Sequence, residues 1–131
     1  MESQTEKNKA VVRKFNEDFL IAGNKETFES LVDPAFINYN MPTDQDTRTM
    51  TRDFILQLMH PALPDRKLTI HDMIAEGDKV FTFKTIEGTL AAPFMNADKP
   101  GSRFSMKIID IIQLKDEKYI AHWSVREVAT Y

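Results

Sequence analysis

The chain contains no cysteine and only four glycines and six prolines in 131 residues. Without cysteine it can have no disulfide bonds, thiolate metal ligands or cysteine nucleophiles. No stretch approaches the roughly 18 consecutive apolar residues of a membrane-spanning helix. The first eight residues are polar and lack the apolar segment of a secretory signal, so we expect a cytoplasmic protein.

A long basic run is also missing. The 17 lysines and arginines are outnumbered by 20 aspartates and glutamates, which gives a formal net charge of −3. This balance disfavours a surface that follows nucleic-acid phosphates, and we expect neither a nucleic-acid nor a membrane partner. The length predicts one domain over residues 1–131, in which residues 1–5 are expected to be disordered.

The spacing of apolar residues changes character along the chain. Helical spacing predicts helices over about residues 5–22, 24–32 and 51–60, with a short strand at 35–40. Strand-like patterns follow at 68–76 and 79–89, and again after a looser segment at 90–101. Helices at the front and strands at the back predict an α+β fold, with three N-terminal helices packed on a strongly curved, mostly antiparallel sheet.

The C-terminal segment predicts a β-hairpin, with strands at about 103–115 and 118–128. A two-residue turn would place Asp110 opposite Trp123. It would likewise place Met106 opposite Glu127. One face of the hairpin would then carry two acids among larger apolar side chains, namely Phe104, Met106, Ile108, Asp110, Ile112, Tyr119, Ala121, Trp123, Val125 and Glu127.

A carboxylate on an apolar face has to be paired, hydrogen-bonded or neutral, so Asp110 and Glu127 are candidate functional residues. Structural explanations remain open for both. Glu127 could reach water at a strand end or pair with Arg103, and Asp110 could bond the Trp123 indole or a helix. An offset of four residues, about 13 Å along a strand, separates the two acids, so we do not expect them to share a proton.

The opposite face of the hairpin would carry Ile109, Ile111, Ile120 and His122. This is too much apolar area for open solvent, so we expect a homodimer formed through the outer sheet face. His60, His71 and His122 match no metal-ligand spacing, and no metal site is expected.

Several short segments, in this order and at this spacing, resemble the SnoaL-like polyketide cyclase family of the nuclear-transport-factor-like superfamily. They are residues 36–42, 63–65, 69–70, 75–80 and 88–89, Asp110, His122-Trp123 and Glu127. The resemblance implies a cone-shaped α+β barrel around a deep pocket, in a homodimer. It also implies an intramolecular aldol ring closure that needs no cofactor, with the catalytic carboxylate at the position of Glu127.

The sequence departs from the family pattern at four places. Ala121 stands where a glutamate is usual before His122-Trp123, and Glu117 stands in place of a turn glycine. Glu127 replaces an aspartate, and Tyr39 stands where a histidine is frequent. We therefore expect Glu127 to be the base, with Tyr39, Trp123 or a protonated Asp110 as the donor to an enolate. The expected ligand-binding residues are Trp123, Phe15, Phe19, Asn40, Met106, Ile108 and Ile112. The alternative is that the apolar side chains among them pack as a filled core with no pocket.

These residues predict a cofactor-independent acid/base enzyme that acts on a small apolar or polyketide-like carbonyl compound. The reaction would be an aldol cyclisation, an isomerisation or a dehydration. Two alternatives are a non-catalytic module that binds a small ligand in the same fold and a plain dimerisation scaffold.

Overall fold

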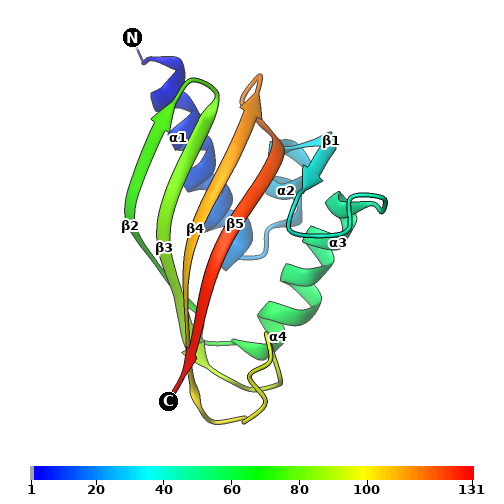
Figure 1. Ribbon diagram of the computed structural model, residues 1–131, viewed down its shortest axis with the longest axis vertical. Coiled ribbons are helices and arrows are strands. Elements are labelled where there is room, and N and C mark those ends of the chain that lie inside the picture. The colour runs from blue at the N-terminus through cyan, green and yellow to red at the C-terminus, as the bar shows by residue number, and fades with distance from the viewer. Residues whose placement is uncertain (1) are drawn as a thin grey trace.

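The computed structural model describes residues 2–131 as three helical segments and a five-stranded mixed sheet (Figure 1). The first helical segment runs from α1 (Gln4–Lys14) directly into η1 (Phe15–Ile21), and the second is α2 (Lys25–Leu31). The third joins α3 (Thr47–Asp53), η2 (Phe54–Met59) and α4 (His60–Ala62). The strands are β1 (Val32–Asn38), β2 (Lys67–Glu76), β3 (Lys79–Thr89), β4 (Arg103–Lys115) and β5 (Lys118–Thr130). The predicted α+β class is confirmed.

The first helix begins earlier than the sequence indicates. The Ser3 side chain accepts a hydrogen bond from the Glu6 amide and caps a helix that starts at Gln4. The predicted disorder therefore does not hold for Gln4 and Thr5, and Met1 lies outside the described residues. Gly23, with a φ of +76°, ends the segment.

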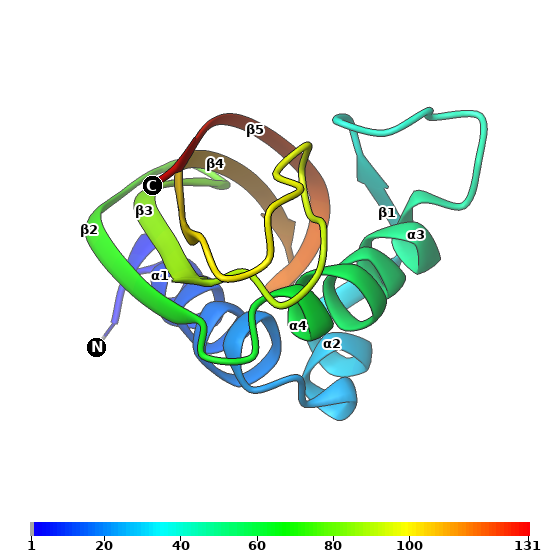
Figure 2. The same ribbon diagram turned by 90° about the horizontal axis from the view of Figure 1, so that it is seen from below.

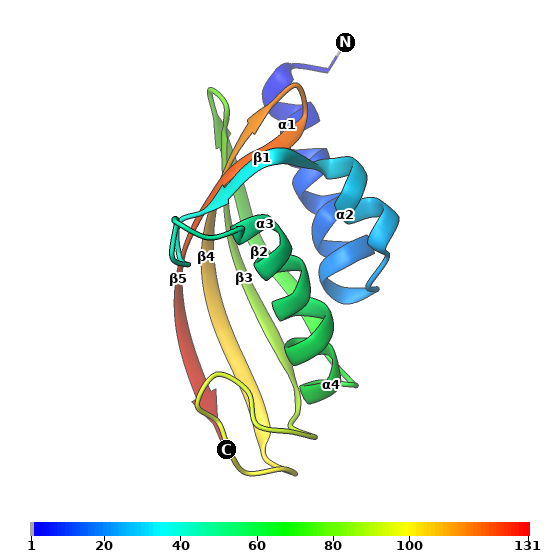
Figure 3. The same cartoon turned by 90° about the vertical axis from the view of Figure 1, so that its right-hand side faces the viewer.

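The sheet has the strand order β1-β5-β4-β3-β2, in which the pairs β5–β4, β4–β3 and β3–β2 are antiparallel. The edge strand β1 runs parallel to β5 and ends with Asn38 opposite His122. The helices lie on one side of this sheet (Figure 3). Within residues 2–131 no helix is long and apolar enough to cross a bilayer.

The core lies between the helices and the inner face of the sheet. Phe19, Phe28 and Phe104 are fully buried there, and the Phe19 and Phe28 rings lie 4.8 Å apart between centroids. At one end of the molecule, residues 90–102 form a loop over the end of the sheet that passes beside α4 (Figure 2). The Ala91 amide donates to the Ala62 carbonyl over 2.8 Å, which ties this segment to the helix.

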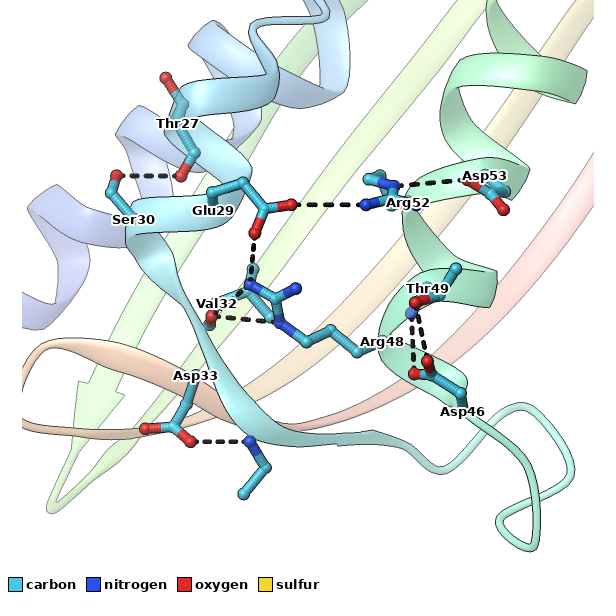
Figure 4. A network of polar contacts seen from close by, with 11 residues as sticks. Thr27, Glu29, Ser30, Val32, Asp33, Asp46, Arg48, Thr49, Arg52 and Asp53 are labelled. Carbon is cyan, nitrogen blue, oxygen red and sulfur yellow. Dashed lines mark hydrogen bonds and ion pairs between the residues drawn. The ribbon is translucent and has the colours of Figure 1, made fainter.

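Arg48 fixes α3 against the second helix and the edge strand (Figure 4). Its guanidinium donates to the Val32 carbonyl over 3.0 Å and pairs with Glu29 over 3.2 Å. It also lies 5.1 Å from the centre of the Phe28 ring. Because Glu29 is exposed, its ion pair adds little stability, and the half-buried bond to Val32 is the stronger restraint on α3.

The turn of the β4–β5 hairpin matches the prediction, because Lys115 pairs with Lys118. The register then shifts: Leu114 pairs with Tyr119, but Gln113 pairs with Ala121. Ile120 is thus an extra residue on β5, which makes a β-bulge.

Beyond this bulge every β5 side chain lies on the face opposite to the one predicted. Asp110 pairs with Ser124 rather than Trp123, and Glu127 pairs with Lys107 rather than Met106. The predicted register is therefore wrong over most of the hairpin. His122, Ser124 and Arg126 share the inner face with Asp110, whereas Trp123, Val125 and Glu127 lie on the outer face.

The outer face carries two rows of apolar side chains across the sheet. They are Ile74, Phe81, Ile111 and Trp123 in one row and Phe83, Ile109 and Val125 in the next. Val125 is 73% exposed and Ile74 is 60% exposed. Tyr39 stacks on Trp123 with the ring centroids 4.9 Å apart. His122 does not belong to this face, contrary to the prediction.

Candidate active site

A cavity of about 80 Å³ lies between the helices and the inner face of the sheet. Its lining is mostly apolar, and the polar side chains in it are Asn16, Asn38, Thr51, Lys84, Asp110, Tyr119, His122 and Arg126. Pockets for drug-sized ligands typically measure about 300–1,000 Å³. The cavity therefore suits a small molecule.

Asp110, near the middle of β4, is the centre of the polar cluster in this cavity. Its Oδ2 pairs with the Lys84 ammonium over 2.5 Å, and both side chains are almost completely buried. Lys84 also donates to Asn16 Oδ1 over 2.6 Å, and Asn16 in turn donates to the Val12 carbonyl over 2.8 Å. The pair is thus held by β3, β4 and the first helix.

His122 reaches the same carboxylate from β5, with 3.0 Å between its Nε2 and Asp110 Oδ1. An ionised carboxylate only accepts hydrogen bonds, so Nε2 must carry a proton. The other ring nitrogen, Nδ1, has no hydrogen-bond partner within residues 2–131, and the residue lines the cavity. A neutral His122 therefore presents the basic lone pair of Nδ1.

Burial alone would raise the pKa of the Asp110 carboxyl. The adjacent Lys84 ammonium and the hydrogen bond from His122 outweigh burial and hold this pKa well below its ordinary value. Asp110 is therefore ionised at neutral pH. It orients the His122 ring and would stabilise a positive charge that formed there.

Tyr119 adds a hydrogen-bond donor to the cavity. Burial raises the pKa of its phenol well above the ordinary value, and the nearby Asp110 carboxylate raises it further. Its hydroxyl makes no hydrogen bond within residues 2–131, and its ring stacks on Phe15 at 4.5 Å between centroids. A phenol that stays protonated can donate to a developing oxyanion but cannot act as a base.

Two hydroxyls beside Asp110 are not satisfied. Thr82 and Ser124 are its direct neighbours on β3 and β5, and each hydroxyl oxygen is buried without a hydrogen-bond partner in the described part of the chain. A buried unpaired hydroxyl costs about 1–3 kcal/mol. The strands thus carry a local destabilisation on both sides of the carboxylate.

The structure brings together some of the predicted site residues. Asp110, Phe15, Met106, Ile108 and Ile112 line the cavity. Phe19 is completely buried in the core and is not part of the lining.

Four other predicted residues lie elsewhere. Glu127 is exposed on the outer face, and Tyr39 and Trp123 stack on each other outside the cavity. The Asn40 side chain donates from Nδ2 to the Ser124 backbone carbonyl over 2.7 Å, and its Oδ1 accepts from the Ser124 backbone N–H over 2.8 Å. Asn40 therefore extends the pairing of β1 with β5 rather than lining the cavity.

Sequence analysis missed Lys84, Asn16 and Arg126 as site residues and placed His122 on the wrong face. Lys84 shares a strand face with Thr82, whereas Phe81 and Phe83 lie on the other face. From the sequence alone, the face with Thr82 and Lys84 therefore looks like the one exposed to solvent. The one available signal was a lysine at the centre of a strand that is otherwise rich in apolar residues. Within residues 2–131 no three His, Asp or Glu side chains are placed to hold a metal ion.

The model of the SnoaL-like polyketide cyclase family matches residues 10–131. The chain belongs to this family. None of the curated proteins compared with it matches.

Solved structures of similar fold cover most of the chain. IdmH, a candidate polyketide cyclase from Streptomyces antibioticus, is 21% identical, with a TM-score of 0.73 over 92% of this chain and 91% of its own. A candidate cyclase from Bacillus cereus is 24% identical, with a TM-score of 0.75 over 96% and 79%. AclR, a candidate hydroxylase from Streptomyces galilaeus, is 19% identical, with a TM-score of 0.78 over 95% and 77%. These likenesses establish the SnoaL-like fold and leave the reaction open.

Replacing Thr82 by valine should stabilise the protein by about 1 kcal/mol, because it removes an unpaired buried hydroxyl and keeps the side-chain shape. Urea unfolding measures the change. Thr51→Val is the matched control: this buried hydroxyl donates to the Thr47 carbonyl over 2.7 Å and accepts from Asn38 over 3.0 Å, so its loss should destabilise. Destabilisation by Thr82→Val as large as that by Thr51→Val would contradict the assignment.

Asp110→Asn should destabilise the protein by about 3–5 kcal/mol at neutral pH, because it leaves Lys84 buried without a counter-charge. The pKa of Asp110 is lower in the folded than in the unfolded chain, so its stabilisation is complete above about pH 5 and declines below about pH 4. The stability gap between wild type and Asp110→Asn should therefore narrow on acidification. Urea unfolding across this pH range tests it, with the exposed Asp98→Asn as control; a constant gap would contradict the ion pair.

Proposed function

We propose that the cavity is the active site of a cofactor-independent acid/base enzyme that acts on a small carbonyl compound. The observation that carries the proposal is the His122–Asp110 pair. An ionised carboxylate orients the imidazole, and the ring's free nitrogen belongs to a small, mostly apolar cavity. Family membership supports acid/base chemistry of this kind without choosing a substrate.

In this mechanism Nδ1 of His122 removes a proton from the carbon next to a carbonyl group. The electron pair of the C–H bond forms an enolate, whose oxygen accepts a hydrogen bond from the Tyr119 hydroxyl. Asp110 stabilises the imidazolium that results. In a cyclisation the enolate carbon then attacks a second carbonyl, and Nδ1 returns its proton to the alkoxide oxygen that forms. In an isomerisation the enolate is conjugated with a C=C bond, and Nδ1 returns its proton to a different carbon. Cyclisation and isomerisation thus share the first step.

Glu127 is not part of this proposal, because its side chain lies on the outer face of the sheet. Tyr119 takes the donor role that the sequence suggested for Tyr39. Lys84 keeps Asp110 ionised, and the geometry gives it no separate chemical step.

A second candidate is a non-catalytic module that binds a small ligand. The observation in its favour is that Lys84 and His122 already occupy both oxygens of Asp110, as they would in a purely structural network. The cavity would then select a ligand without changing it.

Deuterium uptake from D2O next to the carbonyl of butanone, followed by proton NMR, separates these candidates. We expect the wild-type protein to accelerate exchange over buffer and His122→Gln to lose about 100-fold of that acceleration. Tyr119→Phe should lose a similar factor, because it removes the donor to the enolate oxygen. His71→Gln, at an exposed histidine bonded to Thr85, is the control and should behave as wild type.

Wild-type exchange that His122→Gln leaves unchanged would overturn the proposed base. Saturable butanone shifts in amide NMR spectra, without any faster exchange, would favour the binding module.

We also propose that the outer sheet face packs against a second copy of this chain. The two apolar rows support this proposal, because exposed apolar patches of this kind on soluble proteins mark interaction surfaces. The same surface lies on both copies, as a two-fold interface requires. Lys107 and Glu127, which pair across β4 and β5, border the patch and would form its polar rim.

Light scattering during size exclusion should give about twice the chain mass of 15.1 kDa. Val125→Lys should shift the protein to monomer, because it places a charge in the apolar patch. Leu58→Lys is the control, since Leu58 is 54% exposed but lies on the helical side. A monomeric wild type would contradict the dimer.

A further inference from the structure

Arg126 is a charged residue of the cavity that the proposed chemistry does not use. It lies on β5 opposite Ile108, on the inner face, and lines the cavity together with Asp110 and His122. The side chain is half-buried. Within residues 2–131 it makes neither a hydrogen bond nor an ion pair, although a guanidinium offers five N–H donors.

The charge of Arg126 is not balanced by the cavity lining. The ionisable side chains of the lining are Lys84, Asp110, Tyr119, His122 and Arg126. Lys84 and Asp110 compensate each other, and Tyr119 is neutral because its pKa is raised. With a neutral His122, the cavity carries one net positive charge, and that charge is on Arg126.

The nearest carboxylate in sequence does not supply the missing partner. Glu127 follows Arg126 directly, but it lies on the opposite face of the strand, where it pairs with Lys107 across the hairpin. A partly buried arginine that lacks a protein partner has free donors for a ligand anion.

We infer that Arg126 is a carboxylate-binding residue and that the substrates of this site are small oxo-carboxylic acids. The inference rests on the proposed function for the carbonyl half of the molecule. The planar guanidinium matches the two oxygens of a carboxylate with two parallel hydrogen bonds. The small cavity favours a carboxylate over the bulkier phosphate group.

The position of Arg126 also sets the order of groups in the ligand. Arg126 and His122 are four residues apart on the same face of β5, about 13 Å between their backbones. The carboxylate therefore binds at the end of the ligand that is remote from the carbon that loses its proton. The Arg126 and His122 side chains both reach into the same small cavity and cover part of this spacing, so a short chain with an oxo group separated from its carboxylate fits between them.

The test compares 4-oxopentanoate with its neutral amide, 4-oxopentanamide, which differ in charge and share the oxo group. Amide chemical-shift titrations at low ionic strength give both dissociation constants. We expect wild-type protein to bind the acid about tenfold more tightly than the amide. Arg126→Gln should bring the two constants together, and Arg126→Lys, which keeps the charge without the fork, should fall between.

Lys107→Gln is the matched control, because it removes a positive charge from the outer face of the adjacent strand, opposite Glu127. It should leave the tenfold preference intact. Equal binding of acid and amide by the wild type, or an unchanged preference in Arg126→Gln, would overturn the inference. Inorganic phosphate that binds as tightly as 4-oxopentanoate would overturn the assignment to carboxylates.

The two proposals fail separately. His122→Gln should abolish deuterium exchange into 4-oxopentanoate and keep the preference for acid over amide. If the wild type prefers the acid, this preference depends on Arg126, and no exchange is catalysed, the carboxylate subsite is supported and the proposed enzyme activity is contradicted. If exchange proceeds equally well with acid and amide, in both wild type and Arg126→Gln, the enzyme activity is supported and the carboxylate subsite is contradicted.

Discussion

The ion pair between Lys84 and Asp110 is the interaction on which the inner face depends. Removing two charges from water costs several kcal/mol for each ion, and the pair is tolerated only if further hydrogen bonds complete it. Asn16 accepts a further hydrogen bond from the lysine, and His122 donates one to the aspartate. These four residues come from the first helix and three adjacent strands, so the same contacts hold the layers in register and fix the direction of the imidazole.

The helices contribute to this arrangement through their irregular stretches. The first and third helical segments each change from α-helical to π-helical geometry, at η1 and η2. Both stretches line the cavity, with Asn16 from η1 and Ile55 from η2 among their contributions. A π-helical turn is wider than an α-helical one and is frequently found at functional sites. The departure from regular helix occurs here where the helices meet the polar cluster.

The sequence predicted the positions of the helices and strands better than it predicted which strand face is buried. The strand from 79 to 89 was readable because Gly77-Asp78 marks its turn, and its alternation is regular. On that strand, however, Phe81 and Phe83 point outward while Thr82 and Lys84 are buried. Val80 and Ile86 are buried on the same face as Thr82 and Lys84, so a rule that places apolar residues inside does not choose between the two faces of this strand.

The predicted register of the β4–β5 hairpin was wrong for a different reason. The bulge at Ile120 adds one residue to β5, and no glycine or proline marks it between Tyr119 and Ala121. A one-residue slip moves every later side chain to the other face of the strand. Glu127 therefore lies outside the pocket in which it was predicted, and His122 lies inside it. The proposed histidine base and the inferred Arg126 subsite both depend on this slip, which only the three-dimensional pairing reveals.

The short length of β1 has an effect on assembly. Because β1 ends opposite His122 and the Asn40 side chain bonds Ser124, the last residues of β5 pair with β4 on one side only and form a sheet edge on the other in the described chain. Free edges of this kind invite another strand to add and so lead to polymerisation. Arg126 and Glu127 place opposite charges on the two faces of this edge. Charged side chains on an edge strand discourage the addition of another strand, so Arg126, inferred above to bind a carboxylate, would also protect this edge.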